Sequence, residues 1–145
     1  MTYRVLIESD QIVVQAVDAL ILHEPRFANV IELTGVPKLR LRPDGFETLL
    51  QAIVSQQVSV AAANAIWSRL ELNNFVDPNQ ILQTNEDQLK AVGLSRQKIR
   101  YAKALAAANL DYKELRQKSD DEVIRILTEI PVSYTHLRAH ETPRH

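Results

Sequence analysis

Apolar residues recur at the period of an α-helix along most of the chain. From Ile12 to Ile21 they fall at i, i+1, i+4, i+5, i+8 and i+9, which makes one wide helical face. Asp44 and Glu47 have the spacing of a capping box in front of the next long stripe, Phe46 to Val54. Gly93 ends a later stripe, because glycine accepts the left-handed backbone that closes many helices. The pattern predicts an all-α fold of about eight helices with short connections.

Polar residues that accept hydrogen bonds from backbone amides precede the other stripes as well. The predicted caps are Ser9 or Asp10, Ser59, Asp77 before Pro78, Asn85 with Gln88, Ser95, and Ser119 with Glu122. Each cap marks where one helix begins, so the caps divide the chain into its elements.

Composition excludes several classes of protein. The chain has 145 residues, 46% apolar and 24% charged, which suits one folded globular domain. No apolar run approaches the ~20 residues of a membrane span, and the N-terminus lacks the regions of a secretory signal. The absence of cysteine and the count of 3 glycines exclude thiolate sites, disulfides and glycine-rich phosphate loops. We expect a cytoplasmic protein without a membrane partner, and with a net charge of −1 any surface for nucleic acid must be local.

Residues 132–145 differ from the rest, because they contain no apolar stripe and three of the chain's four histidines. This stretch resembles the translation of an adapter used in sequencing libraries. The adapter's bases, read in one frame, encode Val132 to Thr142. The adapter bases on either side also fit codons for Pro131 and His145. We therefore expect residues 1–131 to form the domain and residues 132–145 to be an artefact or a disordered tail.

A zinc site is the alternative interpretation of this stretch. His136 and His140 have the i, i+4 spacing that can chelate zinc on a helix, and Glu141 follows them. Two histidines and one carboxylate fall short of a zinc signature, so we predict no metal site.

Three blocks of the chain carry a family pattern. They are FETLLQAIVSQQVSVAAA at 46–63, LKAVGLSRQKIRYAKALA at 89–106 and DDEVIRILTEI at 120–130. With these blocks the chain resembles the DNA-3-methyladenine glycosylase II branch of the helix-hairpin-helix DNA glycosylase superfamily. The resemblance covers residues 10–131 and implies the helical N-terminal portion of that fold, an incomplete one.

The resemblance also implies an activity. Members flip an alkylated purine out of double-stranded DNA and hydrolyse its N-glycosidic bond, with 3-methyladenine and 7-methylguanine as typical substrates. A carboxylate stabilises the oxocarbenium character that develops on the sugar. We therefore expect a base-excision repair hydrolase that acts as a monomer, needs no cofactor, binds double-stranded DNA with alkylated bases and, in a bacterium, works at the nucleoid.

The family's hairpin glycines and catalytic aspartate would follow Ile130–Pro131, and no residue of this chain matches them. We assign no catalytic residue here and expect the chain as given to lack activity. In the resemblance, Gln57 matches the residue that wedges into the gap left by the flipped base, and Gln56 is its neighbour. Ser59 caps the next helix, whose first amides can face a phosphate. The alternative is that the two glutamines only cap the helices through local hydrogen bonds.

Basic and aromatic residues near these blocks have two interpretations each. Arg96 and Lys98 stand at a helix start, where they either contact DNA phosphates or form a solvated face. Trp67 has the spacing of a core residue, which favours packing over base stacking.

Two other functions stay open at this point. One is an endonuclease III-like member of the same superfamily, although Val58-Ser59-Val60 after the double glutamine favours the alkylation branch. The other is a non-enzymatic helical binding module with a histidine-rich tail.

Overall fold

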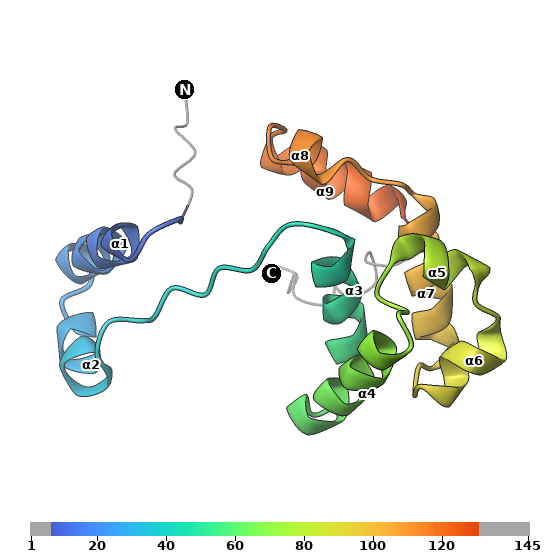
Figure 1. The fold of residues 1–145 in the computed structure, drawn as a ribbon. Helices are drawn as coiled ribbons and strands as arrows, with labels where there is room; N and C mark the ends of the chain where they lie inside the picture. Colours follow the sequence, from blue (N-terminus) through green and yellow to red (C-terminus); the bar gives the residue numbers. More distant parts are fainter. Residues whose placement is uncertain (1–6, 131–145) are drawn as a thin grey trace, which may run out of the picture. The chain divides into compact units, whose positions relative to one another are not determined.

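A computed structural model describes residues 7–130, which form nine α-helices and no strand (Figure 1). This result confirms the predicted all-α fold. None of the helices in residues 7–130 is both long and apolar enough to cross a membrane. The predictions for residues 132–145, including the zinc alternative, lie outside the described residues.

The chain divides into two compact units, Met1–Arg42 and Pro43–His145. The first unit contains α1 (Asp10–His23) and α2 (Phe27–Thr34). Ser9 caps α1 by accepting a hydrogen bond from the Ile12 amide, as one of the two predicted caps. Residues 35–45 have no helix.

The second unit holds the other helices of the described chain, and α7 is its central element. These helices are α3 (Phe46–Ser55), α4 (Val60–Leu72), α5 (Pro78–Gln83), α6 (Glu86–Ala91), α7 (Arg96–Ala107), α8 (Tyr112–Leu115) and α9 (Asp120–Glu129). Helix α7 packs against α3, α5 and α6, and α3 also packs against α4.

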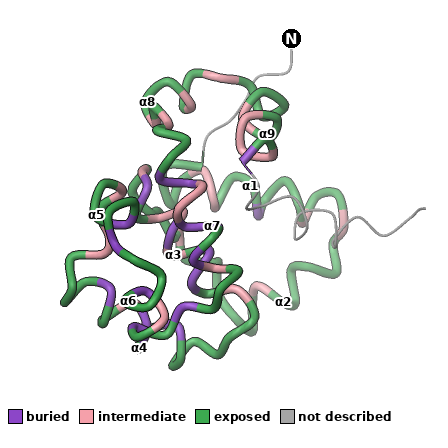
Figure 2. Tube along the Cα trace, turned by 90° about the vertical axis from the view of Figure 1, so that its right-hand side faces the viewer, coloured by how far each residue is buried: buried purple, intermediate pink, exposed green. Residues whose placement is uncertain are grey.

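The core of this unit lies between these helices, as the buried segments in Figure 2 show. The largest side chains with less than 2% of their surface exposed are Leu50, Leu70, Ile81, Leu89, Ile99 and Val54. Full burial of one such side chain contributes about 1.5–3 kcal/mol, so these residues fix the helices that carry them.

Most predicted caps are present. Asn85 with Gln88 and Ser119 with Glu122 form complete capping boxes. The Asp77, Ser95 and Ser59 side chains accept hydrogen bonds from first-turn amides of α5, α7 and α4.

The predicted capping box of Asp44 and Glu47 is wrong. Gly45 is the N-cap of α3 and has no side chain to cap it, so Asp44 lies one residue outside the helix. The Asp44 carboxylate accepts instead from the guanidinium of Arg116, which is 72 positions away in the sequence. A long-range ion pair has replaced the local cap.

Cationic side chains cap three helix ends in this unit. In each case the donor lies on another helix and the acceptor is a backbone carbonyl, which otherwise has no partner at a helix C-terminus. The pairs are Lys98 Nζ with Val54 O at 2.7 Å, Lys103 Nζ with Thr84 O at 2.7 Å, and Arg69 Nε with Val92 O at 2.8 Å. Each bond ties a helix end to the core with a favourable charge–dipole interaction.

Candidate functional site

The turn between α3 and α4 projects the residues singled out by the sequence. Gln56 ends α3 in an extended conformation, and its amide donates to the Ile53 carbonyl at 3.3 Å. Gln57 has a φ of 56°, in the left-handed region. Ser59 returns to an extended conformation and caps α4 through the Ala62 amide at 3.2 Å. The chain therefore reverses from one helix to the next with Gln57 at the bend.

The left-handed backbone at Gln57 is unusual for a residue with a side chain. Such a conformation costs about 1–3 kcal/mol and persists only where the surrounding structure holds it. Gln57 is exposed and Gln56 is half-buried. Neither side-chain amide forms a hydrogen bond with another residue of the range 7–130, so the two glutamines do not cap the helices through their side chains. Because Gln57 is exposed, its side-chain amide is accessible to a ligand.

Apolar side chains flank this bend on the α4 side. Val58 is 38% exposed and Val60 is 78% exposed. The backbone amides of the first turn of α4 point outward along the helix axis, because the first amides of a helix have no partner within it. The Ser59 side chain satisfies the Ala62 amide, and the amides before it are of the kind that binds anions at helix N-termini.

The two predicted phosphate contacts occupy different environments. Arg96 is exposed and lines an open hollow between α6 and α7, together with Glu86, Arg100 and Lys103. Lys98 is half-buried, and its ammonium group donates to Val54 O at the end of α3. Burial lowers the pKa of the Lys98 ammonium below its ordinary value. The structure therefore gives Arg96 a surface position and Lys98 a partner inside the fold.

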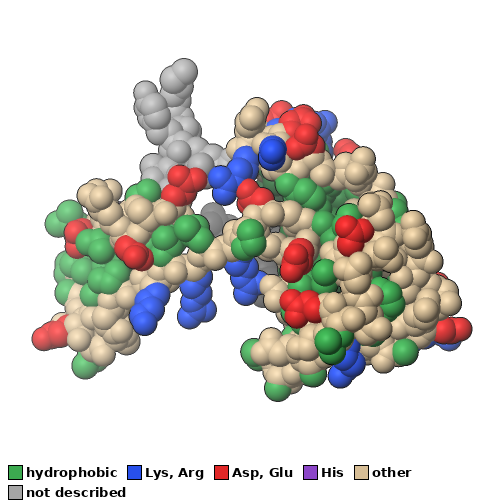
Figure 3. Space-filling model, viewed as in Figure 1, with side chains coloured by type: hydrophobic (Ala, Val, Ile, Leu, Met, Phe, Trp, Pro, Cys, Tyr) green, Lys and Arg blue, Asp and Glu red, His purple; other side chains and the backbone are tan. Residues whose placement is uncertain are grey.

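Charges on the surface of the second unit are mixed in sign. On the face drawn in Figure 3, basic and acidic side chains are interspersed among apolar and polar ones. This distribution agrees with the small net charge of −1, so any contact with a polyanion must be local.

Trp67 packs against the core, as its spacing predicts. Its indole Nε1 donates to Glu71 Oε1 at 2.9 Å, one helical turn further along α4. With both its ring and its N–H group engaged, Trp67 acts as a packing residue.

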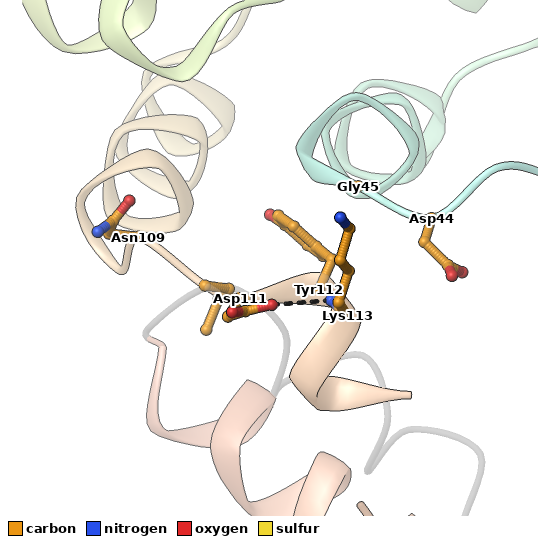
Figure 4. Close-up of a pocket in the computed structure, with 7 residues that line it drawn as sticks. Asp44, Gly45, Asn109, Asp111, Tyr112 and Lys113 are labelled. Atoms are coloured by element: carbon orange, nitrogen blue, oxygen red, sulfur yellow. Dashed lines mark hydrogen bonds between the residues drawn. The ribbon is translucent and has the colours of Figure 1, made fainter. Parts of the chain in front are cut away.

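The structure also contains a pocket that the sequence did not indicate. It lies between the start of α3 and α8, and its lining residues are Asp44, Gly45, Asn109, Leu110, Asp111, Tyr112 and Lys113 (Figure 4). The Asp111 carboxylate caps α8 by accepting from the amides of Lys113 at 2.9 Å and Glu114 at 3.0 Å. Burial raises the pKa of the Tyr112 phenol above its ordinary value.

The carboxylates of this pocket are already engaged, Asp44 with Arg116 and Asp111 with α8. The pocket therefore offers no free general base. Its residues come from segments about 65 positions apart that carry ordinary capping patterns, so no local signal marks them. Within the described residues there is also no group of three or more potential metal ligands.

Comparison with known proteins identifies one matching family model and two related yeast proteins. The family model described as HhH-GPD superfamily base excision DNA repair protein matches residues 50–143, a range that continues beyond the described residues. DNA-3-methyladenine glycosylase 1 of Schizosaccharomyces pombe is 33% identical over 98 residues, which are 61% of this chain and 43% of that protein. The alkylbase DNA glycosidase-like protein mag2 of the same yeast is 26% identical over 117 residues, 72% of this chain and 55% of that protein.

Solved structures agree with these matches. DNA-3-methyladenine glycosidase of Bacillus halodurans superposes with a TM-score of 0.65 and 30% identity, over 78% of this chain and 55% of that one. The 3-methyladenine DNA glycosylase of Schizosaccharomyces pombe, solved in complex with abasic DNA, has a TM-score of 0.61 and 27% identity. It is matched over 71% of this chain and 56% of its own. The chain thus spans about half the length of the relatives it matches.

Proposed function

Because the chain belongs to the HhH-GPD superfamily of base excision DNA repair proteins, we propose that its protein removes alkylated purines from double-stranded DNA. The names of its relatives support 3-methyladenine as the type of substrate. The reaction is hydrolysis of the N-glycosidic bond after the damaged nucleotide has been flipped out. We further propose that the protein acts as a monomer, in the compartment that holds the DNA.

Alkylation of the base already weakens the N-glycosidic bond that such an enzyme breaks. An N-alkylated purine carries a positive charge, which makes it a better leaving group and favours its stacking on aromatic faces. The main requirement is a carboxylate that stabilises the charge on the sugar while the bond breaks. Residues 7–130 provide no carboxylate that we assign to this role, so their contribution lies in holding the DNA.

The contribution of these residues centres on the bend between α3 and α4. In our proposal, Gln57 enters the gap left by the flipped nucleotide, and its amide bonds to the orphaned base. The observation that carries this proposal is the exposed Gln57 side chain, free of hydrogen bonds to the described residues, on a left-handed backbone at the apex of the bend. The outward amides at the start of α4 would hold the neighbouring phosphate.

Substitution of Gln57 tests the proposal. The ratio of the dissociation constants for an intact duplex and for one with a tetrahydrofuran abasic analogue is measured by fluorescence anisotropy. Gln57→Ala should reduce the preference for the abasic duplex about tenfold, the equivalent of one or two net hydrogen bonds.

The control is Gln83→Ala, which removes an exposed glutamine from α5, away from the bend. The control should keep the preference of the unaltered chain. An unchanged preference in Gln57→Ala would show that Gln57 does not act as the wedge.

A further inference from the structure

Helix α3 ends directly before the bend, and two of its last carbonyls accept hydrogen bonds outside the regular α-helical pattern. The Ile53 carbonyl accepts from the Gln56 amide at 3.3 Å. The next carbonyl, that of Val54, accepts from the ammonium group of Lys98 at 2.7 Å, across 44 positions of sequence. Val54 has no exposed surface, so this contact lies at the edge of the core.

Lys98 is well placed to hold this end of the helix. Its backbone is fixed in the first turn of α7, where its amide donates to the Ser95 hydroxyl at 3.2 Å. Helix α7 in turn packs along α3. An ammonium group near a helix C-terminus also interacts favourably with the partial negative charge there.

The other side of the bend is fixed independently. Ser59 caps α4 through the Ala62 amide, and the Ser59 carbonyl accepts from the Ala63 amide at 2.9 Å. Only residues 56–58 therefore connect two fixed points. A short connection between fixed ends leaves Gln57 few alternatives to its left-handed conformation.

We propose that Lys98 is a positioning residue for Gln57: by holding the Val54 carbonyl, it fixes the end of α3 and so presents the Gln57 side chain to DNA in one orientation. The inference rests on the proposed role of Gln57 as the wedge. The benefit of Lys98 is preorganisation, because a rigid bend does not have to be ordered when DNA binds. A direct contact of Lys98 with a phosphate is the competing explanation.

The chain offers a closely matched control in Lys103. It lies on the same helix, and its ammonium group also donates to a backbone carbonyl at 2.7 Å, that of Thr84 after α5. Both lysine side chains are partly buried. Lys103→Met therefore removes one charge and one helix-end hydrogen bond, as Lys98→Met does, without touching the bend.

The experiment compares Lys98→Met and Lys103→Met in the 145-residue chain. Backbone 15N order parameters of residues 56–58 are measured in the free protein, and the abasic preference is measured as above. Lys98→Met should lower the order parameters from about 0.85 to below about 0.6 and reduce the abasic preference about fivefold. Lys103→Met should change neither quantity. The slope of log Kd against log salt should be the same in the two variants and in the unaltered chain, because in this proposal neither lysine contacts a phosphate.

Each result separates the explanations. Unchanged order parameters in Lys98→Met, or equal loss in Lys103→Met, would overturn the inference without bearing on Gln57. A uniform loss of affinity for both duplexes, with a smaller salt slope than in Lys103→Met, would show a phosphate contact and also overturn it. If Gln57→Ala keeps its abasic preference, the wedge proposal fails, and the role of Lys98 fails with it. Lys98→Gln, a smaller change, is compared in the same way if Lys98→Met does not fold.

Discussion

Gly93 connects α6 to α7, and replacing it with alanine should destabilise the second unit. Its φ is +107°, a conformation that residues with a side chain rarely adopt. An added Cβ would lie 2.9 Å from Arg69 Nη2 and 3.0 Å from Ile66 Cγ1. The guanidinium of Arg69 is already tied to Val92 O at 2.8 Å, and Ile66 is buried, so neither neighbour moves away freely.

Three terms set the size of the effect. The backbone conformation costs about 1–3 kcal/mol for alanine, and the crowded Cβ adds about 1–3 kcal/mol of overpacking. Alanine also restricts the backbone of the unfolded chain, which stabilises the folded state by about 0.4–1 kcal/mol. We expect the free energy of unfolding to fall by about 2–4 kcal/mol, a large part of the ~5–15 kcal/mol of a typical domain. The melting temperature should fall by roughly 5–15 °C.

Urea unfolding followed by far-ultraviolet circular dichroism measures this loss, and Gly45→Ala is the matched control. Gly45 also has a positive φ, +138°, but no atom lies within 4 Å of its added Cβ. Gly45→Ala should therefore cost only the conformational part, and the difference between the variants should report the clash. Equal losses in the two variants, or a Gly93→Ala chain as stable as the unaltered one, would refute the steric argument.

Two further outcomes follow from the described residues and from the family. The Ser119 amide and hydroxyl hold the pKa of the Glu122 carboxyl below its ordinary value of 4.5. The stability that this capping box gives α9 should therefore be present above pH 4.5 and be lost as the pH falls through the lower pKa of the folded state. A pH titration of the helix content should show this dependence in the unaltered chain, and the Glu122→Gln variant should lack it. The 145-residue chain should release no 3-methyladenine or 7-methylguanine from alkylated DNA, because none of its residues matches the family's catalytic aspartate, and measurable release in a chromatographic assay would contradict that assignment.

Local patterns were sufficient for the helices and for most of their starts. A capping box joins residues three positions apart, so Asn85 with Gln88 and Ser119 with Glu122 could be found without any tertiary information. The resemblance to the family placed Gln56 and Gln57 directly before the helix that Ser59 caps. The predicted roles of Gln56, Gln57, Ser59, Arg96 and Lys98 in DNA binding remain predictions.

Competition from distant residues explains where local patterns were insufficient. Asp44 and Glu47 have the spacing of a capping box, but the helix starts one residue later than that spacing requires. The Asp44 carboxylate then pairs with Arg116, and nothing in the sequence around Asp44 indicates that guanidinium. The pocket beside α8 was missed for a similar reason, because its two halves meet only after the chain has folded.

Lys98 and Gly93 show most clearly what each level of structure decided. The sequence alone identified Lys98 as a cation at a helix start and Gly93 as a residue that ends a helix, because charge and backbone freedom are properties of single residues. Packing of α7 on α3 brought the Lys98 ammonium to Val54 O, and packing of α4 placed Arg69 and Ile66 against Gly93. Sequence thus determined the helices, most of the caps and the family, whereas contacts 19 to 44 positions apart decided which side chains hold the helix ends. Such contacts depend on how whole helices pack, a property that no short stretch of sequence contains.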